Sequence, residues 1–339
     1  MKRDFGTLKD GQKASLYEIS WGDVKAHISD YGATLVSVFV PDGQGHVVDV
    51  VLGFDSVEKY ERNGAFFGAV VGRNANRIGK GAFFIGEKKV QMPINNNSNN
   101  LHSGPDSLGH RMWTVEKHTE DSIRLSLYSP DGDQGIPGNA QISVTYTVEN
   151  PGALRITYDG VSDKDTVFNM TNHAYFNMAG QDHPEKAMEQ LLMLTARFYT
   201  VADAESIPTG ELRPVEGTPM DFRVPKPIGR DLQEDYPCFR LQKGYDHNFE
   251  AYAEPCAILT DPESGRSMSV STDCPGIQFY SGNFMDGQIG KGGVPYIYRG
   301  GVALETQYYP DSVNHPEWPQ PFYKAGEPYH SETVYTFKW

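Results

Sequence analysis

Cysteine is scarce in this chain, and so are basic residues, long apolar runs and helical periodicity. The 339 residues contain only three cysteines, Cys238, Cys256 and Cys274. They are too few and too far apart for a disulfide framework or a close-spaced zinc site. We therefore expect reduced, structural cysteines and a cytoplasmic protein.

Positive charge is also in short supply. Asp and Glu number 44 against 30 Lys and Arg, which gives a formal net charge of −14. A chain of this charge repels nucleic acid and anionic membrane surfaces. There is no run of 18 apolar residues, and residues 1–7 show no apolar stretch after their basic residues, so we expect neither secretion nor a membrane span. The expected partner is neutral or cationic, and is neither a nucleic acid nor a membrane.

No segment of the chain has the composition of a linker. Strand-like patterning runs through residues 26–339 without a charged block or a Pro/Gly/Ser spacer longer than a loop. Domain boundaries normally fall in such spacers. We therefore predict one domain that spans residues 1–339.

Period-two alternation is the dominant pattern and predicts an all-β fold. Apolar residues recur at every second position in 123–127, 142–148 and 154–158, and turn residues cluster in 129–133, 149–152 and 261–265. The best helical candidate is a short one at 55–60, with Asp55 or Ser56 as the cap. With 35 Gly and 22 Pro, the sequence favours a large antiparallel β-sandwich with few short helices.

His173 lies at the end of a strand-like run. Residues 166–170 before it alternate like a strand, and residues 178–180 after it can turn. A histidine held there can direct its ring into a cleft and transfer protons near neutral pH, because its ordinary pKa is about 6.5. A lone histidine is also commonly a hydrogen-bonded structural residue, so both interpretations stay open at this point.

The glycine-rich stretch 72–81 superficially resembles a phosphate-binding loop. The required G-x4-GK-[ST] spacing is absent, and Gly81 stands where the hydroxyl residue belongs. We therefore reject a nucleotide site. Arg77 in this stretch is either an ion-paired surface arginine or a donor of several hydrogen bonds to a sugar or an oxyanion.

His102 follows the asparagine-rich loop 95–100, at a position where a loop can meet a cleft. It is either a site residue or a loop histidine without a role. A metal site built from His102, His110 and His118 fails, because their eight-residue spacing fits neither one face of a helix nor a compact zinc loop. We expect no metal site.

Three further polar residues lie in turn or strand contexts. Asp246 follows a glycine turn and is suited to bind vicinal hydroxyls, or simply to cap the turn. Gln278 and Phe279 point to opposite faces of their strand, so one can serve a polar cleft while the other packs. Glu305 is the single carboxylate in the β-type run 300–307. Such a residue either faces solvent or is held where its protonation state matters.

Several motifs and a C-terminal tail occur together in one order along the chain. They are Asn76-Arg77-Ile78, Leu101-His102, residues 171–177, Tyr245-Asp246-His247, residues 275–280, Leu304-Glu305-Thr306-Gln307, and a tail with Tyr309-Pro310-Asp311, Asn314, Pro316, Pro319 and residues 326–329. In these motifs the chain resembles the galactose mutarotase, or aldose 1-epimerase, family over nearly its whole length. Any one motif would be weak evidence, whereas the set in this order is specific.

The resemblance implies a fold, a reaction and a set of site residues. The fold would be the galactose mutarotase-like supersandwich, with the site in a cleft on one sheet. The reaction would exchange the α and β anomers of free hexoses such as galactose and glucose, with Glu305 as general base and His173 as general acid. The sugar site would be lined by Asn76, Arg77, His102, Tyr175, Asp246 and Gln278.

The implied chemistry requires only proton transfers. A base takes the proton of the C1 hydroxyl while an acid protonates the ring oxygen; the ring opens, C1 rotates, and the ring closes on the other face. No cofactor is needed. The partner would be a small monosaccharide, and the protein a monomer or a homodimer.

Two departures from the family pattern and three rival functions remain. Ser103 stands where the family commonly has glycine, and His315 where it frequently has glutamine. A hexose-phosphate epimerase on a related fold would need several basic residues at one end of the cleft. A non-catalytic sugar-binding protein would not need both Glu305 and His173. A glycoside hydrolase usually places two carboxylates about 5 to 10 Å apart.

Overall fold

Alternating apolar residues form the longest strands of the structure. The computed structural model describes residues 1–61, 64–149 and 151–339. In it Leu125, Val144 and Tyr158 lie opposite one another on three adjacent strands, and all three are buried. This is the one-sided burial that period-two alternation predicts. The strands predicted at 123–127, 142–148 and 154–158 are thereby confirmed.

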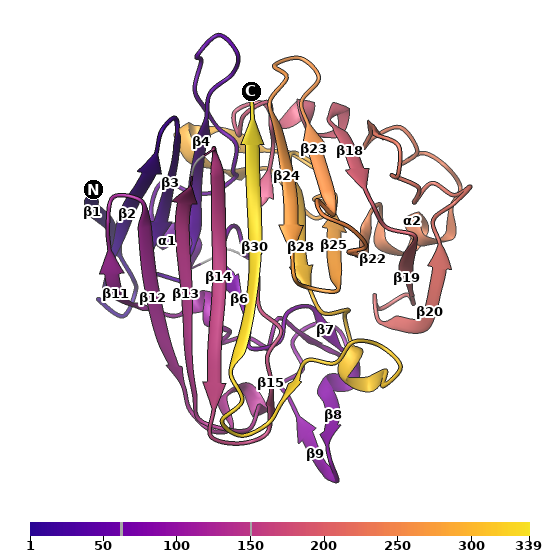
Figure 1. The fold of residues 1–339 in the computed structure, drawn as a ribbon. Coiled ribbons are helices and arrows are strands. Elements are labelled where there is room, and N and C mark those ends of the chain that lie inside the picture. Colours follow the sequence, from indigo (N-terminus) through magenta and orange to yellow (C-terminus); the bar gives the residue numbers. More distant parts are fainter. Residues whose placement is uncertain (62–63, 150) are drawn as a thin grey trace.

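These strands belong to a nine-stranded sheet that crosses Figure 1, with β30 near its centre. In spatial order its strands are β11 (Thr114–His118), β12 (Ser122–Ser129), β13 (Ala140–Glu149), β14 (Ala153–Ser162), β30 (Tyr329–Lys338), β24 (Ser267–Thr272), β23 (Ala257–Thr260), β18 (Leu191–Leu194) and β21 (Lys226–Pro227).

Two further sheets, joined by a bridge between Val51 and Phe176, provide the opposing layer. The five-stranded sheet contains β1 (Lys2–Thr7), β2 (Lys13–Trp21), β3 (Val24–Ser29), β4 (Leu35–Val40) and β5 (Val48–Asp49). The six-stranded sheet contains β17 (Tyr175–Phe176), β28 (Val302–Gln307), β25 (Gly276–Tyr280), β22 (Asp246–Glu250), β19 (Phe198–Ala202) and β20 (Pro208–Pro214).

The two layers share one apolar core. Strand β2 packs against β12 and β13, and the ring of Phe176 lies 5.0 Å from that of Tyr335 in β30. The main cluster of buried apolar side chains extends in sequence from Tyr17 to Phe337. All pairings of the three large sheets are antiparallel within the described ranges. The predicted antiparallel β-sandwich is confirmed.

Short strand pairs and helices complete the fold. The pairs are β6 (Val70–Val71) with β16 (Thr171–Asn172), β7 (Arg77–Ile78) with β10 (Asn100–Leu101), β8 (Ala82–Ile85) with β9 (Lys88–Gln91), β15 (Thr166–Val167) with β29 (Phe322–Tyr323), and β26 (Gln288–Ile289) with β27 (Pro295–Tyr296). The helices are α1 (Val57–Tyr60) and α2 (Pro237–Gln242), with 3-10 turns η1 (Gly79–Gly81), η2 (Leu108–His110), η3 (Asp133–Gly135), η4 (Pro184–Glu189), η5 (Lys291–Gly293) and η6 (Ser312–Asn314).

The local predictions hold with two differences. The short helix predicted at 55–60 is α1, and Ser56 occupies the cap position without a side-chain capping bond. Of the strand-like run 166–170, only the first two residues form a strand. The strand ends at Val167, and Asn169 instead forms an isolated parallel bridge with Asn74 and accepts a hydrogen bond from the Tyr308 backbone N–H through its side-chain oxygen. The turn predicted at 149–152 includes Asn150, which lies outside the described residues.

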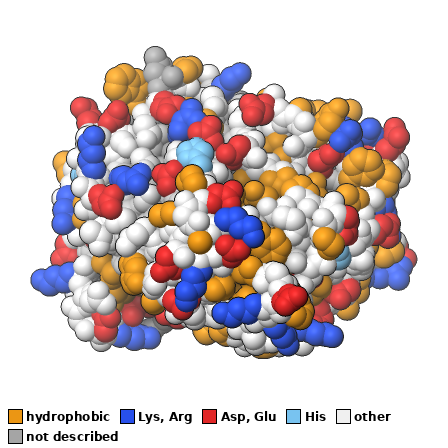
Figure 2. All heavy atoms as spheres, turned by 60° about the horizontal axis from the view of Figure 1, so that its bottom comes forward, with side chains coloured by type: hydrophobic (Ala, Val, Ile, Leu, Met, Phe, Trp, Pro, Cys, Tyr) orange, Lys and Arg blue, Asp and Glu red, His pale blue; other side chains and the backbone are white. Residues whose placement is uncertain are grey.

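The surface mixes charges of both signs. On the face shown in Figure 2, acidic and basic side chains are scattered among one another and among exposed apolar side chains. Cys238, Cys256 and Cys274 are buried and unpaired, as expected for structural cysteines. Across the described residues, no helix has the length and apolar character needed to cross a membrane.

Candidate active site

Strand register gathers polar side chains from four strands on one face of the six-stranded sheet. Glu305 of β28 lies opposite Gln278 of β25, and Tyr280 of β25 lies opposite Asp246 of β22. Side chains two residues apart on a strand share a face, so these four residues point the same way. Tyr175 joins them, because its partner in β28 lies two residues before Glu305.

This face is the floor of a cavity of about 580 Å³. Seven of the eight predicted site residues line it: Asn76, Arg77, His102, His173, Tyr175, Asp246 and Glu305. Gln278 is not part of the lining, but its side chain is hydrogen-bonded to that of Asp246. The volume falls in the range of roughly 300 to 1,000 Å³ that is typical of small-molecule sites.

Glu305 and His173 form a close, buried pair within the cavity. His173 directly follows strand β16, and its Nε2 lies 3.7 Å from Oε1 of Glu305. The two residues are only 6% and 2% exposed. Neither Nδ1 of His173 nor Oε2 of Glu305 has a hydrogen-bond partner among the described residues. Because unpaired buried polar atoms destabilise a fold, such a pair is typical of a site that acts on a ligand.

Burial shifts the pKa values of this pair in opposite directions. Burial, reinforced by the charge of Asp246, raises the pKa of Glu305 from 4.5 to about 8, although Arg77 opposes the shift. Burial lowers the pKa of His173 from 6.5 to about 4. A hydrogen bond with its own backbone and the negative charge of Asp246 oppose this decrease. Near neutral pH the pair therefore holds one proton, on Glu305, and the imidazole is neutral.

His102 is held by its neighbour across the β7–β10 pair. The backbone N–H of Asn76 donates to the ring nitrogen Nδ1 of His102 at 3.1 Å, and the backbone N–H of His102 donates to the Asn76 carbonyl. Burial lowers the pKa of His102 well below its ordinary value, so the ring is neutral. Because Nδ1 accepts a hydrogen bond, the proton is on Nε2. Nε2 is then a hydrogen-bond donor.

The same tautomer argues against a metal centre. Ligand atoms of His102, His173 and Glu305 lie within 4.8 Å of one another, close enough to surround an ion. A metal ligand must offer a free lone pair, and His102 offers none while Asn76 occupies Nδ1 and a proton occupies Nε2. The cluster therefore fits a substrate oxygen better than a metal ion.

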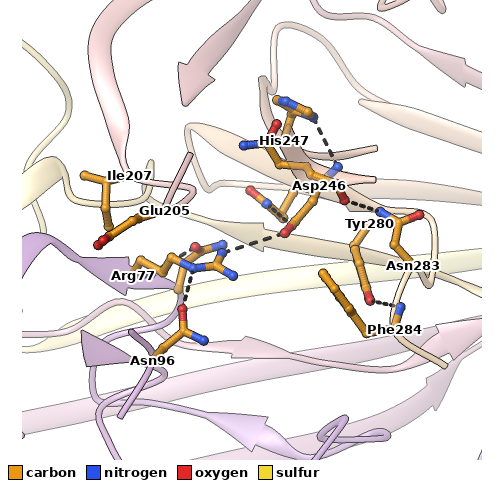
Figure 3. Close-up of polar contacts among 12 residues, drawn as sticks. Arg77, Asn96, Glu205, Ile207, Asp246, His247, Tyr280, Asn283 and Phe284 are labelled. Atoms are coloured by element: carbon orange, nitrogen blue, oxygen red, sulfur yellow. Dashed lines mark hydrogen bonds and ion pairs between the residues drawn. The ribbon is translucent and has the colours of Figure 1, made fainter. Parts of the chain in front are cut away.

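Arg77 is the centre of a second polar network (Figure 3). Its Nε donates to Oδ1 of Asn96 at 3.1 Å, and its Nη1 lies 3.7 Å from Oδ2 of Asp246. Nε2 of Gln278 donates to the other Asp246 oxygen at 2.7 Å. The network fixes a cation and a carboxylate side by side in the cavity lining, an arrangement suited to neighbouring hydroxyl groups.

Both departures from the family pattern have a structural account. Ser103 has φ of +68°, a value that favours glycine. Its hydroxyl accepts from the Asn74 N–H and donates to the Asn74 carbonyl, which stabilises the loop in that conformation. His315 is not part of the cavity lining, and its ring stacks on Trp318 with centroids 4.2 Å apart.

The lining also includes residues that were not predicted, among them Phe66, Asn96, Glu205 and Tyr280. A signal existed for Tyr280, because it follows Gln278 by two positions on one strand. The sequence predicts only a loop at Asn96. Phe66 and Glu205 lie on turns whose neighbours become visible only in three dimensions.

Comparisons with known proteins show that a chain with this layered antiparallel β-fold and this cavity is an enzyme of the epimerase class. The family model for aldose 1-epimerase matches residues 15–336. Galactose mutarotase of Mus musculus is 40% identical over 339 residues, which cover 98% of this chain and 97% of that protein. Aldose 1-epimerase of Escherichia coli is 38% identical over 317 residues, or 91% of each chain.

Solved structures agree with these sequence matches. The aldose epimerase homologue from C. elegans superposes with a TM-score of 0.88 at 32% identity, over 96% of this chain and 99% of that one. Galactose 1-epimerase from Lactobacillus acidophilus gives a TM-score of 0.86 at 26% identity, over 100% and 98%. The chain belongs to the aldose 1-epimerase family.

Proposed function

We propose that this protein interconverts the α and β anomers of free hexoses such as galactose and glucose, with Glu305 as general base and His173 as general acid. The observation that carries the proposal is the buried Glu305–His173 pair in the cavity lining, with Nε2 of His173 3.7 Å from Oε1 of Glu305. Glu305 takes the proton of the C1 hydroxyl while His173 protonates the ring oxygen, and the opened chain rotates about C1 before it closes.

The single proton of the pair is sufficient for this cycle. In the empty site it resides on Glu305, because burial disfavours both charged groups. The productive state, carboxylate with imidazolium, contains the same number of protons and differs by one internal transfer. Sugar hydroxyls that hydrogen-bond to the charged forms favour that transfer. Activity should therefore be highest between the two limits of about pH 4 and pH 8, where the pair holds one proton.

The remaining residues bind and orient the sugar. Asp246 accepts, and Arg77 donates, hydrogen bonds at neighbouring hydroxyls. His102 donates from Nε2, and Asn76 and Tyr175 supply further polar contacts from the wall and the floor. Gln278 acts through Asp246, because its amide nitrogen donates to that carboxylate.

The rival functions fit the cavity less well. Arg77 is the one Lys or Arg among the described lining residues, and it is already engaged by Asp246 and Asn96, so a phosphate would find little positive charge. Asp246 could serve as a second carboxylate for glycoside hydrolysis, but Arg77 and Gln278 contact its two oxygens. A purely sugar-binding site would not require a buried acid and base without partners.

We further propose a single functional domain that acts on a monosaccharide in the cytoplasm, as a monomer or a homodimer. Cavity residues come from positions as distant as Phe66 and Glu305, and the main core cluster runs from Tyr17 to Phe337, which supports one domain. Three buried, unpaired cysteines support a reducing compartment.

The test is anomer exchange by Glu305→Gln, measured by polarimetry with the spontaneous rate subtracted. The amide keeps the volume and the hydrogen-bonding capacity but cannot act as a base, so kcat should fall by roughly 100- to 10,000-fold with little change in KM. His173→Asn should behave similarly, and the double variant should lose far less than the product of the two losses. Glu205→Gln, which removes a carboxylate from the cavity rim, is the matched control. Near wild-type turnover by Glu305→Gln would refute the mechanism.

A further inference from the structure

The ring of Phe66 contacts three histidines in the cavity region. Its centroid lies 4.9 Å from that of His102, 5.1 Å from that of His110 and 6.1 Å from that of His173. Against His173 the two rings are stacked, with 25° between their planes. Tyr175 stacks on the same imidazole at 5.1 Å and 29°. Two aromatic rings therefore lie almost parallel to the imidazole that we assign as the acid.

The turn that carries Phe66 is hydrogen-bonded to the backbone of His173 itself. Gly68 N–H donates to the His173 carbonyl at 2.9 Å, and His173 N–H donates to the Ala69 carbonyl at 3.0 Å. The side-chain amide of Asn172 donates to the Gly68 carbonyl at 2.7 Å. These bonds connect the turn and the histidine as one unit, so the position of the Phe66 ring follows that of His173.

The backbone of this turn is strained at Phe66. Its φ is +56°, a left-handed value that bulky side chains rarely adopt. Gly68 is also left-handed, and a side chain there would meet the Leu35 carbonyl oxygen 2.0 Å away. Strain of this kind persists where the surrounding structure enforces it, and it concentrates at functional sites. Here it directs an aromatic side chain into the cavity lining, where Phe66 is only half-buried.

We propose that Phe66 is a positioning residue for His173, whose ring fixes the plane of the imidazole and keeps water from it while the sugar is turned over. Phe66 has no group that can transfer a proton, so it acts only through His173. This inference rests on the role of His173 in the proposed function, and its test includes a measurement that does not depend on catalysis.

Solvent access is the property that removal of the ring changes. The titratable or charged groups around His173 come from five elements: Tyr175 of β17, Glu305 of β28, Asp246 of β22, His102 after β10, and His110 of η2 beyond Phe66. All of them remain in a Phe66→Ala variant. Burial is the largest cause of the low pKa of His173, so water that enters the vacated space should raise that pKa.

The experiment titrates the His173 imidazole by NMR in folded Phe66→Ala, with the resonance assigned from His173→Asn. We expect the pKa to rise from about 4 toward 6.5 by about one unit or more. The limb of the kcat profile that belongs to His173 should move in the same direction. We also expect kcat to fall about tenfold at neutral pH, with a smaller change in KM, because the imidazole loses its fixed orientation.

Two variants make the result specific. Phe66→Tyr keeps the flat ring and should retain the wild-type titration and kcat. Phe284→Ala removes another aromatic side chain that lines the cavity and stacks on Tyr280 rather than on a histidine. It should affect KM without moving the His173 titration. If Phe66→Ala does not fold, Phe66→Leu replaces it, with a smaller shift expected.

The outcomes separate this inference from the proposed function. An unchanged His173 titration in the folded Phe66 variant, or an equal shift in Phe284→Ala, would overturn the role of Phe66 even if His173 is the acid. A shifted titration in a protein whose His173→Asn variant keeps full activity would support the positioning role and refute the catalytic assignment.

Discussion

Replacement of Glu305 by glutamine should stabilise the protein at alkaline pH while it removes activity. Glu305 is 2% exposed, and one of its oxygens lacks a partner among the described residues. Its pKa is raised from 4.5 to about 8, mainly by burial. The folded state therefore binds this proton more tightly than the unfolded chain does. The stability that results is fully present below pH 4.5 and is lost as the pH rises toward 8.

The magnitude follows from the size of the shift. A pKa unit corresponds to about 1.4 kcal/mol, so a shift of about 3.5 units for a fully buried group amounts to about 5 kcal/mol. About 4 kcal/mol of this stability is lost between pH 5 and pH 9. Because glutamine does not ionise, the Glu305→Gln variant does not lose this stability as the pH rises. His173 is present in both proteins, so its contribution, which is lost as the pH falls from 6.5 toward 4, cancels in the comparison.

Urea unfolding at pH 5, 7 and 9, followed by fluorescence of the four tryptophans, measures the effect. The free energy of unfolding of Glu305→Gln minus that of the wild type should increase by about 4 kcal/mol from pH 5 to pH 9. Any constant effect of the substitution drops out of this difference. The exposed Glu205 is the control, because its pKa is lowered by hydrogen bonds from Ser98 and Asn99, and Glu205→Gln should give a nearly constant difference over this range. A constant difference for Glu305→Gln as well would show that Glu305 ionises normally, and the argument from burial would be wrong.

Three further outcomes are expected. Asp246→Asn should raise KM by about 10- to 100-fold, since a charged acceptor is lost at nearly constant shape, and unchanged kcat and KM would remove Asp246 from the site. Asn96→Ala frees Nε of Arg77 and should raise KM several-fold with little change in kcat, whereas a main effect on kcat would contradict a binding role for this network. Exhaustive chelation should leave mutarotation intact, since the mechanism needs only proton transfers, and loss of activity in a folded protein would count against it.

The strands of the fold were predictable because they are half-buried. Residues 144–148 alternate between buried apolar and partly exposed polar side chains, and that alternation is written in the sequence. The same logic failed after Val167, where the pairing with β29 ends and Asn169 bonds to distant segments, through a backbone bridge with Asn74 and through its side chain to the Tyr308 backbone. Partners so far away in the sequence leave no periodic signal.

Site residues were predictable to different degrees. Glu305, His173 and the polar set around them were found through motifs in a known order, and the structure brings seven of the eight together around one cavity. Asn96 and Phe66 were missed for a physical reason. Their contacts with Arg77 and His173 depend on how separate loops approach one another.

The floor of the cavity is built from strands, whereas its rim is built from loops. Glu305 and Asp246 project from strands with a neighbour on each side, so moving either would shift the register of a whole sheet. Asn96, Glu205 and Phe284 belong to loops between strands. Loops tolerate insertions and substitutions that strands do not. A protein built this way can diverge in which sugars it admits while its chemistry stays fixed, and selection for a new substrate should accumulate changes in the 95–99, 203–207 and 281–287 loops first.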